Sequence, residues 1–160
     1  MALRLVRIDD RLIHGQVVAV WLRAIGAHRI VIVDDRTAAD AFLKELSILA
    51  APQGVPVEVH DTTEGAKRVA ELAATSENAF VLMRSPVTAL QLRKAGVPFD
   101  VLNVGGMGAG AGRRSLYKNI SASDEELKAM RELEAMGTRV ELRIVADDRP
   151  VPFSSVDKGA

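Results

Sequence analysis

Residues 6–17 read Val-Arg-Ile-Asp-Asp-Arg-Leu-Ile-His-Gly-Gln-Val. This stretch begins in an apolar run, crosses four charges within five residues and reaches His14 directly before a helical pattern. A loop that only joins a buried strand to a buried helix is usually built from Gly, Asn or Ser. Side chains at the carboxyl ends of strands line the crevice of an open α/β sheet. We therefore expect a strand, a functional loop and a helix here, with the rest of the chain as a scaffold that presents His14.

Strand-like and helix-like patterns alternate along the rest of the chain. Apolar runs predict strands at 3–8, 29–33, 55–59, 79–83, 100–104 and 139–145, with a further short one at 116–120. Asp34 and Asp35 can cap one helix whose apolar side carries Ala39, Phe42, Leu46 and Leu49. This rhythm predicts one α/β domain, residues 1–160, with an open, mostly parallel β-sheet of about six to seven strands and helices on both faces. The polar residues 147–160 predict a loosely ordered tail.

A glycine-rich loop is expected at residues 105–114. Within it, Gly106-Met-Gly-Ala-Gly-Ala111 satisfies the loose dinucleotide-binding pattern G-x-G-x-x-A. A true dinucleotide loop follows the first strand and opens a helix, whereas this one follows the fifth strand and leads into Arg-Arg-Ser-Leu-Tyr. We interpret the match as coincidental, and a contact with phosphate or with a partner suits this loop better.

Composition excludes several classes of function. The 160 residues carry 21 basic and 21 acidic side chains, so no bulk positive field favours nucleic acid or an anionic membrane. Cysteine is absent, which excludes disulfides and thiolate chemistry. The apolar stretch at the N-terminus is too short, and charged residues follow it too early, for a signal peptide. No apolar run approaches the roughly 18 residues of a membrane span. We expect a cytoplasmic protein.

The predicted sheet brings three loops to one edge, after its first, fourth and fifth strands. Helix N-termini at Gly15 and at Ser85-Pro86 would direct unpaired N–H groups into the crevice, an arrangement that binds phosphate without net basic charge. The guanidinium groups of Arg7 and Arg11 suit phosphate oxygens, and Arg84 adds a further positive charge.

A histidine in such an anion site can act as a nucleophile. Imidazole titrates near neutral pH and can attack phosphorus in its neutral form. Phosphoryl transfer requires mainly positioning and charge neutralisation, so the protein needs little else. Asp9 or Asp10 would hold the ring of His14 or an arginine in place. Residue types alone give equal weight to a plain salt-bridged loop with a solvated histidine.

A family resemblance favours the nucleophile. Residues Arg7 to Val17, followed by Trp21, resemble the phosphorylation-site segment of the enzyme IIB component of the mannose/fructose/sorbose family, part of the bacterial phosphoenolpyruvate-dependent sugar phosphotransferase system (PTS). Asn103-Val-Gly-Gly-Met107 resembles the second signature of this family, and Val140-Glu-Leu-Arg143 resembles its final strand. The resemblance spans nearly the whole chain and implies an open, largely parallel sheet with helices on both faces.

The resemblance implies a protein-phosphohistidine–sugar phosphotransferase. His14 would accept a phosphoryl group on Nδ1 from the phosphohistidine of a separate IIA phosphocarrier protein, and would pass it to a sugar carried in by the membrane components IIC and IID. Arg11 would neutralise the phosphate, and Asp10 would complete the catalytic group. We expect the phosphate to be bound by Arg7, Gly15, Gln16, Arg84 and Ser85. No cofactor, metal ion or nucleic acid is expected, and a homo-oligomer is compatible with the sequence.

Two alternatives belong to other classes. A receiver-like domain would take phosphate on aspartate in a pocket of Asp9, Asp10 and Asp61, with Ser85 as its hydroxyl. Asn103-Val-Gly-Gly stands where such domains carry a lysine after the fifth strand, and the histidine has no role in that scheme. A metal site made of Asp9, Asp10 and His14 is disfavoured separately, because Arg7 and Arg11 would repel the ion. The second alternative is an orphan IIB domain that serves as a regulatory binding module, against which an intact His14 and Arg11 argue.

Overall fold

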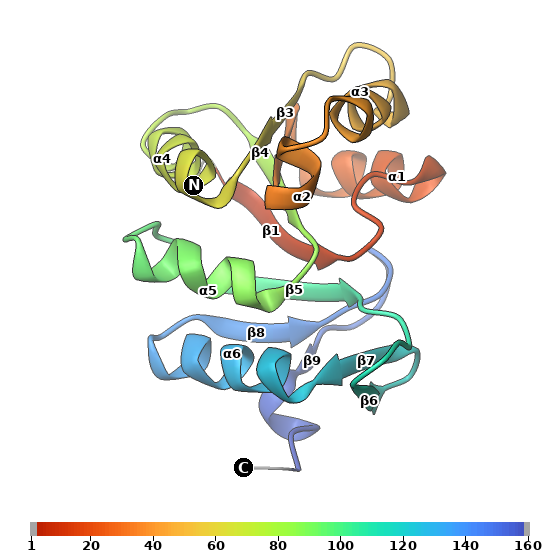
Figure 1. Cartoon of the computed structure of the whole chain (residues 1–160), viewed down its shortest axis with the longest axis vertical. Helices are drawn as coiled ribbons and strands as arrows, with labels where there is room; N and C mark the ends of the chain where they lie inside the picture. Colours follow the sequence, from red (N-terminus) through yellow and green to blue (C-terminus); the bar gives the residue numbers. More distant parts are fainter. Residues whose placement is uncertain (1–2, 159–160) are drawn as a thin grey trace.

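A seven-stranded sheet with β1 (Leu3–Asp9) at its centre organises the computed structural model, which describes residues 3–158 apart from the side chain of Gln16 (Figure 1). The strand order is β3-β2-β4-β1-β5-β8-β9. All pairs in this sheet are parallel except that of β8 and β9. The predicted fold class, an α/β domain with an open and mostly parallel sheet, is therefore confirmed.

The other strands are β2 (Arg29–Val33), β3 (Val57–His60), β4 (Ala79–Met83), β5 (Val101–Gly106), β8 (Arg139–Leu142) and β9 (Val151–Pro152), with β6 (Arg113–Tyr117) and β7 (Ile120–Ser123) in a separate antiparallel hairpin. The helices are α1 (Gly15–Ile25), α2 (Asp35–Ala38), α3 (Ala41–Ala50), α4 (Thr62–Ala73), α5 (Pro86–Lys94) and α6 (Asp124–Ala135), followed by a 3-10 turn, η1 (Phe153–Ser155).

Helices cover both faces of the sheet, because its strands are apolar on both sides. One apolar cluster joins the sheet to α4, α5 and α6, which lie in front of it in Figure 1. A second cluster lies on the other face, where α1 packs Val18, Trp21 and Leu22 against Ile30 and Ile32 of β2. A strand covered on both faces has to be a continuous apolar run, which is the pattern that predicted β2 and β4.

The sheet topology brings the loops after β1, β4 and β5 together, as predicted. Ile8 of β1 lies opposite Met83 of β4 on one side and Val104 of β5 on the other. The chain leaves β1 toward one edge of the sheet and, after β4, crosses to the other side of β1. Such a change of direction opens a crevice at the carboxyl ends of the strands. Figure 1 shows the arrowheads of β1, β5 and β8 directed to the same side, where the β6–β7 hairpin also lies.

The expected helix after residue 34 is two helices. Asp40 interrupts it by accepting hydrogen bonds from the backbone N–H groups of Phe42 and Leu43, and so caps α3 as a new helix. The apolar side of α3 faces outward, with Phe42 60% and Leu49 72% exposed. The apolar spacing therefore correctly predicts a helix here, but the apolar side of that helix is exposed.

Two further expectations are wrong. The short strand at 116–120 is part of a hairpin, in which Lys118 takes a left-handed conformation (φ 49°) at the turn between β6 and β7. The tail expected to be loose at 147–160 instead packs on the domain over 151–157: β9 pairs with β8, Phe153 is 1% exposed, and Arg131 binds the carboxylate of Asp157 at 2.7 Å. Its residues 159 and 160 lie outside the described part of the chain. No helix within residues 3–158 is long and apolar enough to cross a membrane.

Candidate functional site

His14 stands at the start of α1, after a tightly turned loop from the end of β1. The turn is closed by a hydrogen bond of 2.9 Å from the N–H of Leu12 to the carbonyl of Asp9. Leu12 has φ 55°, in the left-handed region that favours glycine, and is held there because its side chain is buried. Such locally strained conformations concentrate at functional sites. The imidazole of His14 is 23% exposed and therefore remains accessible.

Asp9 holds one nitrogen of this imidazole. Nε2 of His14 lies 3.1 Å from Oδ2 of Asp9, the last residue of β1. Burial by itself raises the pKa of Asp9, but hydrogen bonds from Arg11 and His14 outweigh it and hold the pKa below its usual value. The carboxylate is therefore ionised and can only accept, so Nε2 must be the donor. In the neutral ring, the lone pair then lies on Nδ1.

Arg11 is the exposed cation beside this pair. Its Nε lies 3.2 Å and its backbone N–H 3.1 Å from Oδ1 of Asp9. Its side chain is 56% exposed, whereas that of Asp9 is 2% exposed. The guanidinium can therefore turn from Asp9 toward an anion bound at His14 without leaving a buried cavity.

Arg7 lies beneath Asp9 and not in the crevice. Its Nη2 is 3.7 Å from Oδ2 of Asp9, and its side chain is 2% exposed. Burial lowers the pKa of Arg7 to about 10, which leaves it charged at neutral pH. The structure does not place Arg7 beside the other expected phosphate ligands, because the guanidinium is buried and its hydrogen bonds are taken up by the protein.

The hydrogen-bond partners of Arg7 lie in the two later family signatures and in the residue directly after the last of them. Nη1 donates to the side-chain oxygen of Asn103 on β5 and, at 2.8 Å, to the carbonyl of Arg143, while Nη2 donates to the carbonyl of Ile144 at 2.9 Å. The guanidinium stacks 4.5 Å from the ring centroid of Trp21. Trp21 is 1% exposed and therefore belongs to the core. Sequence reasoning missed the role of Asn103 and the Arg143 carbonyl, although a polar residue in a buried strand was an available signal.

Glycine is required at two positions of β5 because these side chains pass so close to it. A Cβ atom on Gly105 would lie 2.0 Å from the guanidinium of Arg7, and one on Gly106 would lie 2.4 Å from Oδ1 of Asp9. Real Cβ contacts essentially never fall below 3.0 Å. The Gly105-Gly106 pair therefore makes room for the buried Arg7 and Asp9.

Asp10 faces away from the imidazole. Its Oδ2 accepts from the N–H of Gly108 at 2.9 Å and from Nη1 of Arg113 at 3.0 Å. Of the two aspartates expected to hold the ring or an arginine, Asp9 thus contacts the ring and Asp10 holds an arginine, Arg113, while the catalytic role expected of Asp10 stays a prediction. Successive side chains at a strand end point to opposite sides, which separates the two aspartates.

The remaining predicted phosphate ligands lie around the same loop ends. Arg84 follows β4, and its Nη1 donates to the carbonyl of Asp10 at 2.7 Å. Ser85 caps α5 by accepting from the N–H of Val87 at 3.2 Å. Gly15, with φ 49°, and Gln16 form the first turn of α1, and the side chain of Gln16 lies outside the described part of the chain.

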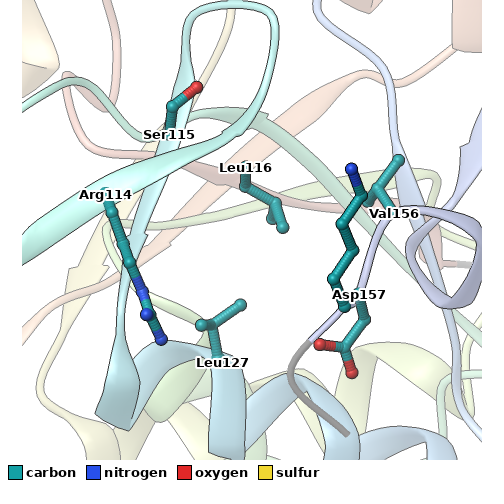
Figure 2. Close-up of a pocket in the computed structure, with 7 residues that line it drawn as sticks. Arg114, Ser115, Leu116, Leu127, Val156 and Asp157 are labelled. Atoms are coloured by element: carbon teal, nitrogen blue, oxygen red, sulfur yellow. The ribbon is translucent and has the colours of Figure 1, made fainter.

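A cavity of about 190 Å³ adjoins Arg11 and the glycine pair, and is lined also by Asp10, Gly108, Asn119 and Ile144. A different cavity of about 300 Å³ lies between the hairpin, α6 and the C-terminal segment, where Arg114, Leu127 and Asp157 line it (Figure 2). None of the residues around His14 lines this second cavity.

The receiver-like alternative is contradicted by the strand order. Asp61 follows β3, which is three strands from β1, or about 14 Å at the usual spacing. Asp61 instead caps α4 by accepting from the N–H of Glu64 at 2.8 Å. Within residues 3–158, no group of three or more His, Asp or Glu side chains is placed to hold a metal ion.

The fold and the site define an α/β protein that presents a carboxylate-bound histidine, at a helix N-terminus and beside an exposed arginine, at the carboxyl edge of a parallel sheet. Residues 3–158 match the family model of the PTS system sorbose subfamily IIB component. The chain belongs to this family, whose members are phosphotransferases of sugar transport. The resemblance seen in the sequence is thereby confirmed.

Individual relatives agree with this assignment. The chain is 36% identical over 151 residues to the sorbose-specific EIIB component of Klebsiella pneumoniae, covering 94% of this chain and 92% of that protein. It is 34% identical over 162 residues to the mannose-specific EIIAB component of Escherichia coli, covering 99% of this chain and 50% of that protein. The crystal structure of the IIBSor domain of the sorbose permease from Klebsiella pneumoniae superposes with a TM-score of 0.92 at 35% identity, over 100% of this chain and 99% of that one.

Proposed function

We propose that His14 is the phosphoryl carrier of this IIB component. Nδ1 attacks the phosphorus of a phosphohistidine on a IIA protein; the Nδ1–P bond forms as the donor N–P bond breaks, and the electron pair of that bond returns to the donor ring. The observation that carries the proposal is the 3.1 Å contact of Nε2 with Asp9, since it leaves the Nδ1 lone pair for attack.

Asp9 also suits the charge that this step creates. Attack by a neutral imidazole through Nδ1 places positive charge on the ring, with the proton still on Nε2. The ionised Asp9 carboxylate, already in contact with Nε2, stabilises that charge, so no proton has to be transferred.

The phosphate itself needs positive charge and donors on its own side. Arg11 is near, charged and exposed, and the N–H groups at Gly15 and Gln16 belong to the N-terminus of α1. Arg84 and Ser85 follow the end of β4 and form the opposite wall of the proposed phosphate site. Arg84 donates to the carbonyl of Asp10 in the His14 loop, and Ser85 caps the start of α5.

The acceptor in the second step is the hydroxyl of a sugar entering through membrane components IIC and IID. Its oxygen forms the new bond to phosphorus, the electron pair of the Nδ1–P bond returns to His14, and the hydroxyl proton leaves to a base on the acceptor side. The Escherichia coli relative is named EIIAB, so a IIA partner is the natural donor, and the protein would act on the cytoplasmic face of the membrane through its partners.

The test is phosphorylation by phosphoenolpyruvate and the upstream PTS phosphocarriers, followed by acid and alkali treatment. Phosphate on His14 is lost in acid and survives alkali, whereas phosphate on an aspartate is destroyed by alkali. With radiolabelled phosphoenolpyruvate, His14→Ala should fold normally and take up no labelled phosphate. Labelled phosphate on His14→Ala would refute the assignment. Label on His14 that cannot be passed to a sugar by membranes containing IIC and IID would favour a regulatory module instead.

A further inference from the structure

Asp10 is the residue that joins the His14 loop to the rest of the site. Its N–H donates to the carbonyl of Gly106 at 2.7 Å, and its carbonyl accepts from Arg84 at 2.7 Å. Its carboxylate accepts from Gly108 and Arg113. Asp10 therefore ties the loop after β1 to those after β4 and β5, and its position fixes the next residue along, Arg11.

Arg113 is the cation that holds this carboxylate. It comes from β6, in the hairpin outside the main sheet, and is 19% exposed. Its Nε and Nη2 each donate to Glu126 at 2.9 Å, which leaves Nη1 for Oδ2 of Asp10 at 3.0 Å and for the carbonyl of Gly108 at 2.9 Å. Hydrogen bonds to Glu126 and then to Asp10 outweigh partial burial and raise the pKa of Arg113, so the group stays charged.

The hairpin is thus anchored on α6 and reaches across to the His14 loop. Glu126 completes the capping box at the start of α6, which fixes the far end of the Arg113 side chain. The N–H of Ser121 on β7 also donates to the carbonyl of Met107 at 2.7 Å. Arg113 can therefore hold Asp10 from a rigid base.

We propose that Arg113 is a positioning residue for phosphoryl transfer at His14, which acts through Asp10 to keep that carboxylate away from Arg11 and the phosphate. The proposal rests on the proposed function. Without Arg113, the Asp10 carboxylate lies beside Arg11 in the chain and can draw the exposed guanidinium into an ion pair. Arg11 would then be withheld from the phosphate, and an unneutralised Asp10 would repel the roughly −1.5 to −2 charge of a phosphoryl group.

The experiment measures transfer from phosphorylated IIA to the full chain at several donor concentrations. Arg113→Gln should lower kcat by about 10- to 100-fold, the effect of a misplaced catalytic group, with little change in KM. Arg113→Lys, which keeps the charge, should recover part of the loss. Arg114→Gln is the matched control, because Arg114 lies next to Arg113 on the same strand and pairs only at the surface with Asp124.

Two further variants separate positioning from a structural role. Glu126→Gln keeps the Asp10 partner of Arg113 and a capping-box residue but weakens the anchor of the guanidinium on α6, so kcat should fall less than in Arg113→Gln. In an Asp10→Asn background, Arg113→Gln should have little additional effect, because no carboxylate remains to capture Arg11. Thermal unfolding of each variant checks the fold.

Three results would overturn the inference. The first is a wild-type kcat in Arg113→Gln, and the second is a fall in kcat in Glu126→Gln as large as that in Arg113→Gln. The third is that Arg113→Gln lowers kcat by the same factor in the wild-type chain and in the Asp10→Asn variant. If the wild-type chain takes no acid-labile phosphate at all, the proposed function fails. If it does and Arg113→Gln matches it, only the role of Arg113 fails.

Discussion

Gly106→Ala is the substitution whose effect the structure specifies most directly. Gly106 lies opposite Asp9 in the parallel pairing of β1 with β5. A Cβ at this position would stand 2.4 Å from Oδ1 and 2.6 Å from the carboxyl carbon of Asp9, whereas ordinary contacts begin at 3.4 Å. The carboxylate would therefore have to move by about 1 Å, the difference between 3.4 and 2.4 Å.

That displacement acts on both stability and transfer. Inserting a methyl group into a packed interior costs typically about 1–3 kcal/mol of unfolding free energy. Asp9 is also the group that holds Nε2 of His14, and a misplacement of about 1 Å at a reacting group can lower a rate by about 100-fold. We expect Gly106→Ala to fold with reduced stability and to lose most of its transfer rate.

The assay is transfer of radiolabelled phosphate from phosphorylated IIA, paired with urea unfolding of the same preparation. Gly108→Ala is the matched control in the same loop, because its Cβ would approach Oδ2 of Asp10 only to 3.9 Å. It should transfer phosphate at the wild-type rate. Wild-type transfer by Gly106→Ala, or an equal loss in both variants, would refute the argument that the glycine is needed to seat Asp9.

Three further expectations follow from exposure and charge. Arg11→Ala should slow transfer by about 100- to 1,000-fold, as expected for loss of a donor worth about 2.7–4 kcal/mol in the transition state, with unfolding free energy little changed. Hydrogen bonds from Arg68 hold the pKa of Glu58 at about 2, below the usual 4.5. The stability that ionised Glu58 contributes is therefore present above about pH 4.5 and is lost as the pH falls toward 2. The free energy of unfolding of Glu58→Gln should accordingly depend less on pH over that range. Leu49→Gln, on the exposed side of α3, should change the urea-derived free energy of unfolding by less than about 0.5 kcal/mol.

The scaffold was predictable because its determinants are local. Continuous apolar runs predicted β2 and β4, and the adjacency of the loops after β1, β4 and β5 followed from placing their strands in a parallel sheet. The outward side of α3 was not predictable in the same way. Apolar spacing shows that a helix has an apolar side, but the break at Asp40 turns the chain and decides where that side points.

The division of labour between neighbouring charges depends on long-range contacts. Arg7 and Arg11 look alike in the sequence, yet Arg7 is fixed by groups 96 and 136 residues away. Similarly, nothing local distinguishes Asp9 from Asp10. Only the pairing of β1 with β5, and the return of the hairpin over the glycine-rich loop, assigns one carboxylate to the imidazole and the other to Arg113.

The two arginines on Asp9 explain how one carboxylate can remain ionised while the site changes charge. In the proposed cycle, Arg11 is drawn toward each incoming phosphate, because its side chain is 56% exposed and its contacts with Asp9 are at 3.2–3.4 Å. Arg7 cannot follow, since burial and three hydrogen bonds hold it in place. When Arg11 leaves, Asp9 thus keeps a fixed positive neighbour at 3.7 Å beneath it and the ring of His14 above it. A single arginine could not both bind the phosphate and compensate the charge of Asp9. An arginine free enough to move to the phosphate would leave the buried carboxylate without a permanent counter-charge.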